Sequence, residues 1–142
     1  MFKNILKYLL IIISLFIIVG CNSKRDDDSK EVVDIIKVII NEKEYTLDLE
    51  DNETAKSFAL MLPKEFNMKE LNGNEKYVYL DKALPINEYN PKHINKGDVM
   101  LFNDNCLVVF YKSFDTSYSY TKIGHISDLP DIGAEDIVIT FK

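Results

Sequence analysis

The sequence predicts a domain built almost entirely of β-strands, with a single short helix, in residues 33–142. From Asp34 onward, apolar residues recur at every second position in short runs separated by turn residues, the spacing of strands with one buried face. The run Cys106–Tyr111 is apolar on both sides and therefore needs cover on both faces of its sheet. Only one segment has helical spacing. These observations predict an all-β barrel or sandwich with one helix that plugs it.

The first two strands form a hairpin around a turn at Asn41–Lys43. Their apolar faces consist of Ile36, Val38 and Ile40 in the first strand and of Tyr45, Leu47 and Leu49 in the second. Polar residues occupy the alternate positions of the second strand, which predicts one buried and one solvated face.

A helix follows the hairpin, with Asp51 or Asn52 as its N-cap. Its apolar stripe falls at i, i+3, i+4 and i+7, which is the spacing of one helix face. The stripe consists of Ala55, Phe58, Ala59 and Leu62. Pro63 is expected to end the helix, because proline lacks the backbone N–H that a continuing helix needs.

Six further strands bring the expected total to eight. Phe66 and Met68 alternate with polar residues before an Asn72-Gly73 turn, and Tyr77 and Tyr79 then face away from Val78 and Leu80. The other expected strands are 99–102 and 106–111, joined by a tight turn at 103–105, then 118–126 and 137–141. No segment repeats another at a fixed period, which excludes a solenoid.

The N-terminal segment has the features of an export signal. Lys3 and Lys7 precede the apolar run Tyr8–Val19, which is shorter than the roughly 20 residues of a membrane-spanning helix. The tetrapeptide Ile18–Cys21, which overlaps the end of this run, resembles the lipobox of bacterial lipoproteins. In that motif the signal is cut before a cysteine that carries lipid. Residues 1–20 are therefore expected to be a signal peptide and Cys21 the lipidated residue. An uncleaved N-terminal anchor is the alternative, and both place the domain at a membrane, on its extracytoplasmic side.

Residues 21–32 are expected to be the lipidated cysteine and a flexible tether, because the residues after Cys21 bring too little apolar surface to order them. Without residues 1–20, which hold two lysines and no acidic residue, the chain carries 15 basic and 23 acidic residues, a net charge of −8. This balance argues against a nucleic-acid partner. Lipidation of Cys21 would leave Cys106 without a disulfide partner, as a buried and unreactive thiol.

Three stretches of the sequence resemble the cyclophilin-like domain family of bacteria and archaea. They are Asn52-Glu53-Thr54-Ala55 through Met61-Leu62-Pro63, Leu71-Asn72-Gly73-Asn74-Glu75-Lys76-Tyr77, and Gly97–Phe102 with Leu107–Phe114 and Tyr118–Gly124. The resemblance covers about residues 33–142. It implies a closed eight-stranded cyclophilin-like barrel, in agreement with the eight strands counted above, but no established activity.

True cyclophilins isomerise peptidyl-prolyl bonds with the help of an arginine. The only arginine of this chain is Arg25, in the tether, so the barrel itself holds none. Lys122 could supply a charge, but an ammonium does not reproduce the planar fork of donors of a guanidinium. Weak isomerase activity therefore stays an alternative to the leading hypothesis of a non-catalytic module, and it is the only enzyme class that the sequence supports.

Aromatic and small hydroxyl residues alternate in Ser113–Tyr120, directly after a buried strand. This composition is typical of recognition surfaces, because tyrosine presents an apolar body with a polar tip. The residues expected to bind a peptide or small-molecule ligand are Tyr77, Tyr79, Phe110, Phe114, Tyr118, Tyr120 and Lys122. The alternative is that the tyrosines only fill one face of a strand. The long loop Asp81–Lys96 is a second candidate segment for function.

Other chemistries find little support in the sequence. His93 and His125 lack a nucleophile-elbow motif for use with Ser117 or Ser119, which favours structural or exposed histidines. There is no metal-binding spacing of Cys or His, no EF-hand loop and no Gly-rich phosphate loop. No cofactor is expected. The sequence predicts a lipid-anchored binding module, with a structural interaction protein of the cell envelope as a further alternative.

Overall fold

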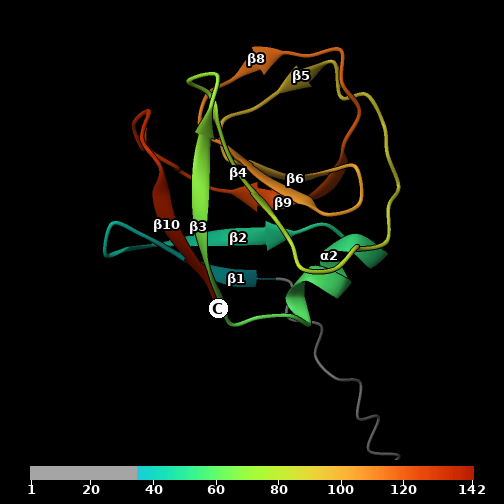
Figure 1. Cartoon of the computed structure of the whole chain (residues 1–142), viewed down its shortest axis with the longest axis horizontal. Coiled ribbons are helices and arrows are strands. Elements are labelled where there is room, and N and C mark those ends of the chain that lie inside the picture. The colour runs from blue at the N-terminus through green and yellow to red at the C-terminus, as the bar shows by residue number, and fades with distance from the viewer. Residues whose placement is uncertain (1–34) are drawn as a thin grey trace, which may run out of the picture. The chain divides into compact units, whose positions relative to one another are not determined.

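Eight strands close into an antiparallel barrel in the computed structural model, which describes residues 35–142 (Figure 1). The elements are β1 (Ile35–Ile40), β2 (Lys43–Leu49), α2 (Glu53–Ala59), β3 (Lys64–Leu71), β4 (Glu75–Tyr79), β5 (His93–Ile94), β6 (Asp98–Phe102), β7 (Cys106–Phe110), β8 (Phe114–Asp115), β9 (Thr121–Ile126) and β10 (Ile137–Phe141). Around the barrel the order is β1, β10, β3, β4, β7, β6, β9 and β2, which pairs again with β1. The short β5 and β8 form a separate two-stranded sheet. The predicted closed barrel with one short helix is confirmed.

Several predictions concern the part of the chain that the structure does not describe. The signal peptide at residues 1–20, the lipidated Cys21 and the tether with Arg25 all lie outside the described residues. Within residues 35–142, no helix has the length and the apolar character needed to cross a membrane.

Residues that tolerate a left-handed backbone form the three predicted turns. Asn41 and Glu42, with φ of 49° and 64°, join β1 to β2 in a two-residue turn that suits the right-handed twist of strands. Asn72 and Gly73, with φ of 57° and 69°, turn β3 into β4, and Asn103 (φ 51°) begins the turn between β6 and β7. These turns fix the register of each hairpin.

The barrel interior is filled from the apolar faces that the alternation predicted. Ile36, Val38 and Ile40 of β1 are all buried in one core cluster with Phe58 and Phe141. Phe58, on α2, packs edge-to-face against Phe141 of β10 with 5.3 Å between ring centroids. The helix therefore contributes to the barrel core, as a plug would.

The helix is shorter than its apolar stripe suggests. Its N-cap is Asn52, whose Oδ1 accepts a hydrogen bond from the Ala55 N–H at 2.8 Å. The Asn52 Nδ2 donates to the Lys122 carbonyl at 2.8 Å and so ties the start of the helix to β9. The helix ends at Ala59, so Leu62 and Pro63 follow it rather than close it.

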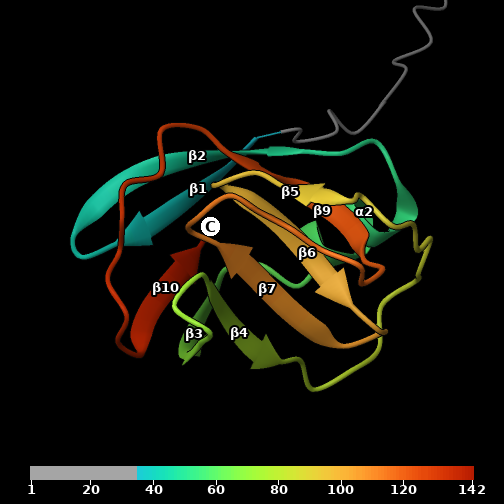
Figure 2. The same ribbon diagram turned by 90° about the horizontal axis from the view of Figure 1, so that it is seen from above.

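Strands β6 and β7 are covered on both faces, as their composition predicted. Figure 2 shows β6 and β7 side by side with β4 next to β7. On their outer face Met100, Val108 and Phe110 form a second buried cluster with Ile94 of β5, and Phe114 of β8 packs against it. The long loop that was a candidate for function therefore carries part of this cover. Strands of two residues are too short for a period-two signal, which is why β5 and β8 were not predicted.

A lysine lies inside the barrel wall with no exposure to solvent. The Lys76 ammonium donates to the Glu70 carboxylate at 2.6 Å and to the carbonyls of Gly133 and Glu135 at 2.5 and 2.7 Å. It also lies 4.5 Å from the centre of the Tyr111 ring, whose hydroxyl donates to Glu70 at 2.9 Å. This network joins the loop before β10 to β3 and β4.

Candidate ligand-binding groove

The outward face of β4 carries a row of three polar and aromatic residues. Side chains alternate across a strand, so Glu75, Tyr77 and Tyr79 point out of the barrel while Lys76 points inward. Tyr77 pairs with Val108 of β7 and Tyr79 with Cys106. The two tyrosine rings meet edge-to-face at 5.9 Å between centroids. Tyr77 and Tyr79 were predicted to lie on the opposite strand face from Leu80. Leu80 is buried in the core, so this prediction is confirmed.

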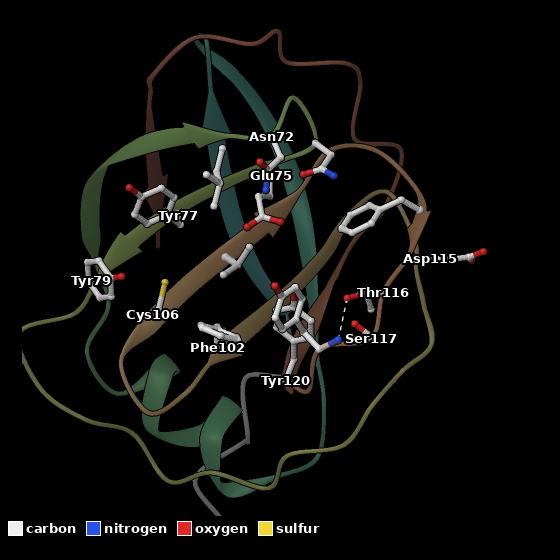
Figure 3. A pocket seen from close by; sticks show the side chains of 15 residues that line it. Asn72, Glu75, Tyr77, Tyr79, Phe102, Cys106, Asp115, Thr116, Ser117 and Tyr120 are labelled. Carbon is white, nitrogen blue, oxygen red and sulfur yellow. Dashed lines mark hydrogen bonds between the residues drawn. The ribbon is translucent and has the colours of Figure 1, made fainter.

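A cavity of about 480 Å³ lies over this face. We refer to it as the tyrosine groove. Figure 3 shows Tyr77 and Tyr79 on one side, Thr116 and Ser117 on the other, and the Glu75 side chain between them. The groove is formed by the outward residues of β4, by Phe102, Cys106 and Val108 of β6 and β7, by the segment Phe114–Tyr118 with Tyr120, and by Leu71, Asn72 and Asn74 of the β3–β4 turn.

Five of the seven residues that the sequence suggested for ligand binding line the groove. They are Tyr77, Tyr79, Phe114, Tyr118 and Tyr120. Tyr79 and Tyr118 are 66% and 63% exposed, so their rings are available to a ligand. The structure thus brings together two tyrosine pairs that lie about forty residues apart in the sequence. Ligand binding by these residues stays a prediction.

Phe110 lies beneath the groove rather than in its lining. It is fully buried, with its ring centroid 5.6 Å from that of Phe114 and 5.5 Å from that of Tyr120. Phe110 can therefore support the two aromatic residues but does not reach the groove itself.

Lys122 also lies outside the groove. Its ammonium is 3.3 Å from the Glu50 carboxylate and 3.9 Å from that of Asp98. Strand β9 begins at Thr121, three residues later than predicted, so Tyr118 and Tyr120 belong to the preceding segment and Lys122 does not continue their wall. The positive charge that Lys122 was expected to supply is therefore engaged elsewhere.

Glu75 is a groove residue that sequence reasoning missed. Its carboxyl pKa is raised to about 7, because burial penalises the charged form and because the Glu70 carboxylate lies nearby. No hydrogen bond or ion pair joins the Glu75 side chain to another residue among 35–142. Its place two positions before Tyr77 on the same strand face was the signal that could have identified it.

The charge of the groove is negative. Of the described residues, Glu75 and Asp115 are the charged ones in its lining, and no lysine, arginine or histidine of this part of the chain lines it. Asp115 points away from the groove in Figure 3, and its carboxylate contacts the His93 Nδ1 at 2.7 Å. Cys106 is 6% exposed, and burial, followed by the charge of Glu75, raises the pKa of its thiol to about 11. The thiol is therefore protonated at neutral pH, as expected for an unreactive cysteine.

A second cluster of polar side chains, away from the tyrosine groove, includes Asp98 at the start of β6. The buried Asp98 carboxylate contacts the His125 Nδ1 at 3.0 Å and accepts from the Asn95 N–H at 2.9 Å. No serine hydroxyl joins His125 in the described part of the chain, so this pair lacks the nucleophile of a catalytic triad. Residues 35–142 also hold no group of three His, Cys, Asp or Glu side chains that could bind a metal ion.

Comparison with known proteins identifies the family to which this barrel corresponds. A family model described as the cyclophilin-like family matches residues 38–142. No curated protein and no solved structure matches the chain. The match extends from β1 through the last residue of the chain and so includes every element that forms the groove.

Proposed function

This chain belongs to the cyclophilin-like family, and we propose that its barrel is a non-catalytic binding module for a peptide or a small molecule. The observation that carries the proposal is the tyrosine groove. Its volume of about 480 Å³ falls within the range of roughly 300–1,000 Å³ that ligand pockets occupy. Tyrosines suit such a site because their rings bury large area and their hydroxyls form hydrogen bonds.

The charge of the groove argues against prolyl isomerisation. Twisting the peptide bond meets a barrier of about 18–20 kcal/mol, and a cationic donor to the prolyl nitrogen lowers it by stabilising the twisted state. No basic side chain from the described part of the chain lines the tyrosine groove, and the charged groups of its lining are the carboxyl groups of Glu75 and Asp115. Binding without catalysis is therefore the better supported function.

Removal of two groove tyrosines is expected to abolish ligand binding while the barrel stays folded. The barrel closes and buries its core within residues 35–142, so the acyl-free chain 22–142 is a suitable sample. In a positional-scanning hexapeptide library, we expect the double variant Tyr77→Ala/Tyr79→Ala to bind the selected peptides at least about tenfold more weakly. Tyr89→Ala, a tyrosine change outside the groove lining, is the matched control and should bind as the parent does.

The same sample decides between the binding and the isomerase hypotheses. We expect no acceleration of cis–trans exchange in a proline-containing tetrapeptide by the chain 22–142. Exchange at rates typical of cyclophilins would overturn the non-catalytic proposal. Equal binding by the parent and the double tyrosine variant would instead show that the groove is not the ligand site.

We further propose that the protein is a lipoprotein of the cell membrane, anchored through Cys21 on the extracytoplasmic side. The support is the short apolar run before Gly20 and the cysteine that follows it. A multiply acylated cysteine would give stable attachment, which a single acyl chain does not.

Replacement of the anchor cysteine is expected to release the protein from lipid. In cells fed labelled palmitate, the full chain should incorporate label and the Cys21→Ser variant should not. Cys106→Ser is the matched control, because its buried thiol is not expected to accept lipid. Labelling that persists in Cys21→Ser, or that depends on Cys106, would contradict the lipoprotein proposal.

A further inference from the structure

The Glu75 carboxylate lies in the tyrosine groove without a partner. It stands opposite Phe110 on β7, is half-buried, and lines the same groove as Val108, Phe114 and Tyr77. Carboxylates that leave water are normally paired with a cation or with several hydrogen-bond donors. Among residues 35–142 no donor reaches the Glu75 side chain. The groove therefore presents an acceptor that no donor from residues 35–142 satisfies, and a ligand can supply that donor.

A second acceptor of the groove lacks a donor as well. The Oδ1 atom of Asn74 is buried and has no hydrogen-bond partner among the described residues. Asn74 precedes Glu75 in the chain and belongs to the same lining. A buried oxygen left unpaired is destabilising, so a donor that reached it would be favoured. An ammonium has three donors and a guanidinium five.

The aromatic residues of the groove favour a positive ligand for a separate reason. Tyr77, Tyr79, Tyr118 and Tyr120 all contribute to the lining. The face of an aromatic ring attracts cations, and several rings around one site bind ammonium groups in this way. Among residues 35–142 no basic side chain lines the groove, so none of them competes for these ring faces or for Glu75.

From these observations we propose that the tyrosine groove binds the organic cation of its ligand, an ammonium or guanidinium group, against the Glu75 carboxylate and the tyrosine rings. The inference rests on the proposed binding function and names the chemical class of the ligand. The cation can belong to a basic side chain of a peptide or to a free amine, because both present the same group to Glu75.

The inference includes a pH dependence with a definite sign. The Glu75 carboxyl, with a pKa of about 7, is largely protonated at pH 5.5 and ionised at pH 8, so cation affinity should rise with pH. Three neighbouring groups, Cys106, Tyr120 and Glu70, have pKa values shifted away from this interval. Burial raises the pKa of Cys106 to about 11 and also raises that of Tyr120. Burial works to raise the pKa of Glu70, but its hydrogen bonds lower it overall.

The remaining titratable groups near the groove are Asp115 and its partner His93 from β8 and β5, and the hydroxyls of Tyr77, Tyr79 and Tyr118. The variant His93→Asn separates the histidine from Glu75. We expect the pH dependence to persist in His93→Asn and to vanish in Glu75→Gln.

The test is calorimetric titration of the acyl-free chain 22–142 with four probes. Three are acetylated and amidated tripeptides with lysine, arginine or norleucine between two alanines, and the fourth is cadaverine, a free diamine. The norleucine tripeptide carries no charge. At pH 8 we expect at least one of the other probes, the lysine tripeptide, the arginine tripeptide or cadaverine, to bind at least tenfold more tightly than it. Peptide binding without cadaverine binding identifies a peptide ligand, and the reverse identifies a small amine.

The decisive variant is Glu75→Gln, with Glu88→Gln as a matched control in an exposed loop position outside the groove. We expect Glu75→Gln to weaken cation binding at least tenfold at pH 8 and Glu88→Gln to leave it unchanged. In the parent, affinity should fall roughly tenfold or more between pH 8 and pH 5.5.

The Glu75→Gln variant is expected to fold. The folded-state pKa of Glu75 lies above its ordinary value of 4.5, so its ionised form opposes folding as pH rises through 7, and the amide removes that charge. Its melting temperature at pH 8 should equal or exceed that of the parent. Cation binding that is unchanged in Glu75→Gln, equal binding of norleucine, or no binding of any cation probe would each overturn the proposal. The proposed function fails separately, if hexapeptide binding does not depend on Tyr77 and Tyr79.

Discussion

Replacement of Lys76 by alanine is expected to destabilise the barrel by about 3–5 kcal/mol, most of the margin that holds a typical domain folded. All three donors of the Lys76 ammonium are used, by the carboxylate of Glu70 and by the carbonyls of Gly133 and Glu135. Alanine would remove the cation that neutralises Glu70, whose side chain is only 17% exposed, and would leave the two carbonyl oxygens without this donor. Removing one member of a buried ion pair is strongly destabilising for this reason.

The measurement is urea unfolding at neutral pH, compared with Lys69→Ala. Lys69 forms an ion pair of the same length, 2.6 Å, with Asp136, but both side chains are more than half exposed. Water screens exposed ion pairs and leaves them little net effect, so Lys69→Ala should change stability far less than Lys76→Ala. Similar losses for the two variants would show that burial of the Lys76 pair is not what makes it important.

Replacement of Gly97 by alanine is expected to be nearly as damaging, by about 3 kcal/mol, because two separate effects add. Gly97 has φ of 99°, a conformation that side chains with a Cβ rarely adopt. Its backbone pairs with Phe110 and with Ile126 at 2.8 Å each, and an added Cβ would collide with the Ile126 carbonyl oxygen. Neither the segment that contains Gly97 nor strand β9 can move away from this contact without losing these hydrogen bonds.

Gly73→Ala separates the two effects. Gly73 also has a positive φ, 69°, but an added Cβ there would meet no atom within 4 Å. This variant should lose only the conformational part, about 1–2 kcal/mol. If Gly97→Ala and Gly73→Ala unfold at the same urea concentration, the close contact between Gly97 and Ile126 of β9 does not add to the loss of stability at Gly97.

The sequence was most informative for strands with one face buried in the core and the other exposed to solvent. Ile36, Val38 and Ile40 were assigned to the interior by spacing alone, and all three are buried. The turns were predictable for a similar reason, because Asn and Gly tolerate the positive φ that Asn41, Asn72 and Gly73 adopt. The buried strand faces and the turns depend only on residues close together in the sequence, so local sequence patterns predict them.

Features that depend on distant partners were not predictable in this way. A lysine on a strand is normally read as solvated, yet Lys76 is buried because three acceptors from β3 and the loop before β10 surround it. The groove tyrosines were found from their composition, but Glu75 was not assigned to the strand, because the predicted strand began at Tyr77 and the strand in the structure begins at Glu75. Lys122 was assigned to the ligand site because nothing local reveals its pairing with Glu50 and Asp98.

Closure of the barrel restricts how this protein can recognise an extended peptide. Every one of the eight barrel strands is hydrogen-bonded to a neighbour on each side, so the ring offers no free edge for a ninth strand. A peptide therefore cannot be captured there by β-augmentation, which reads main-chain groups and is tolerant of sequence. Along the ring of barrel strands recognition therefore relies on side chains, whereas the segment Phe114–Tyr118 beside the groove and the separate β5–β8 sheet lie outside this restriction.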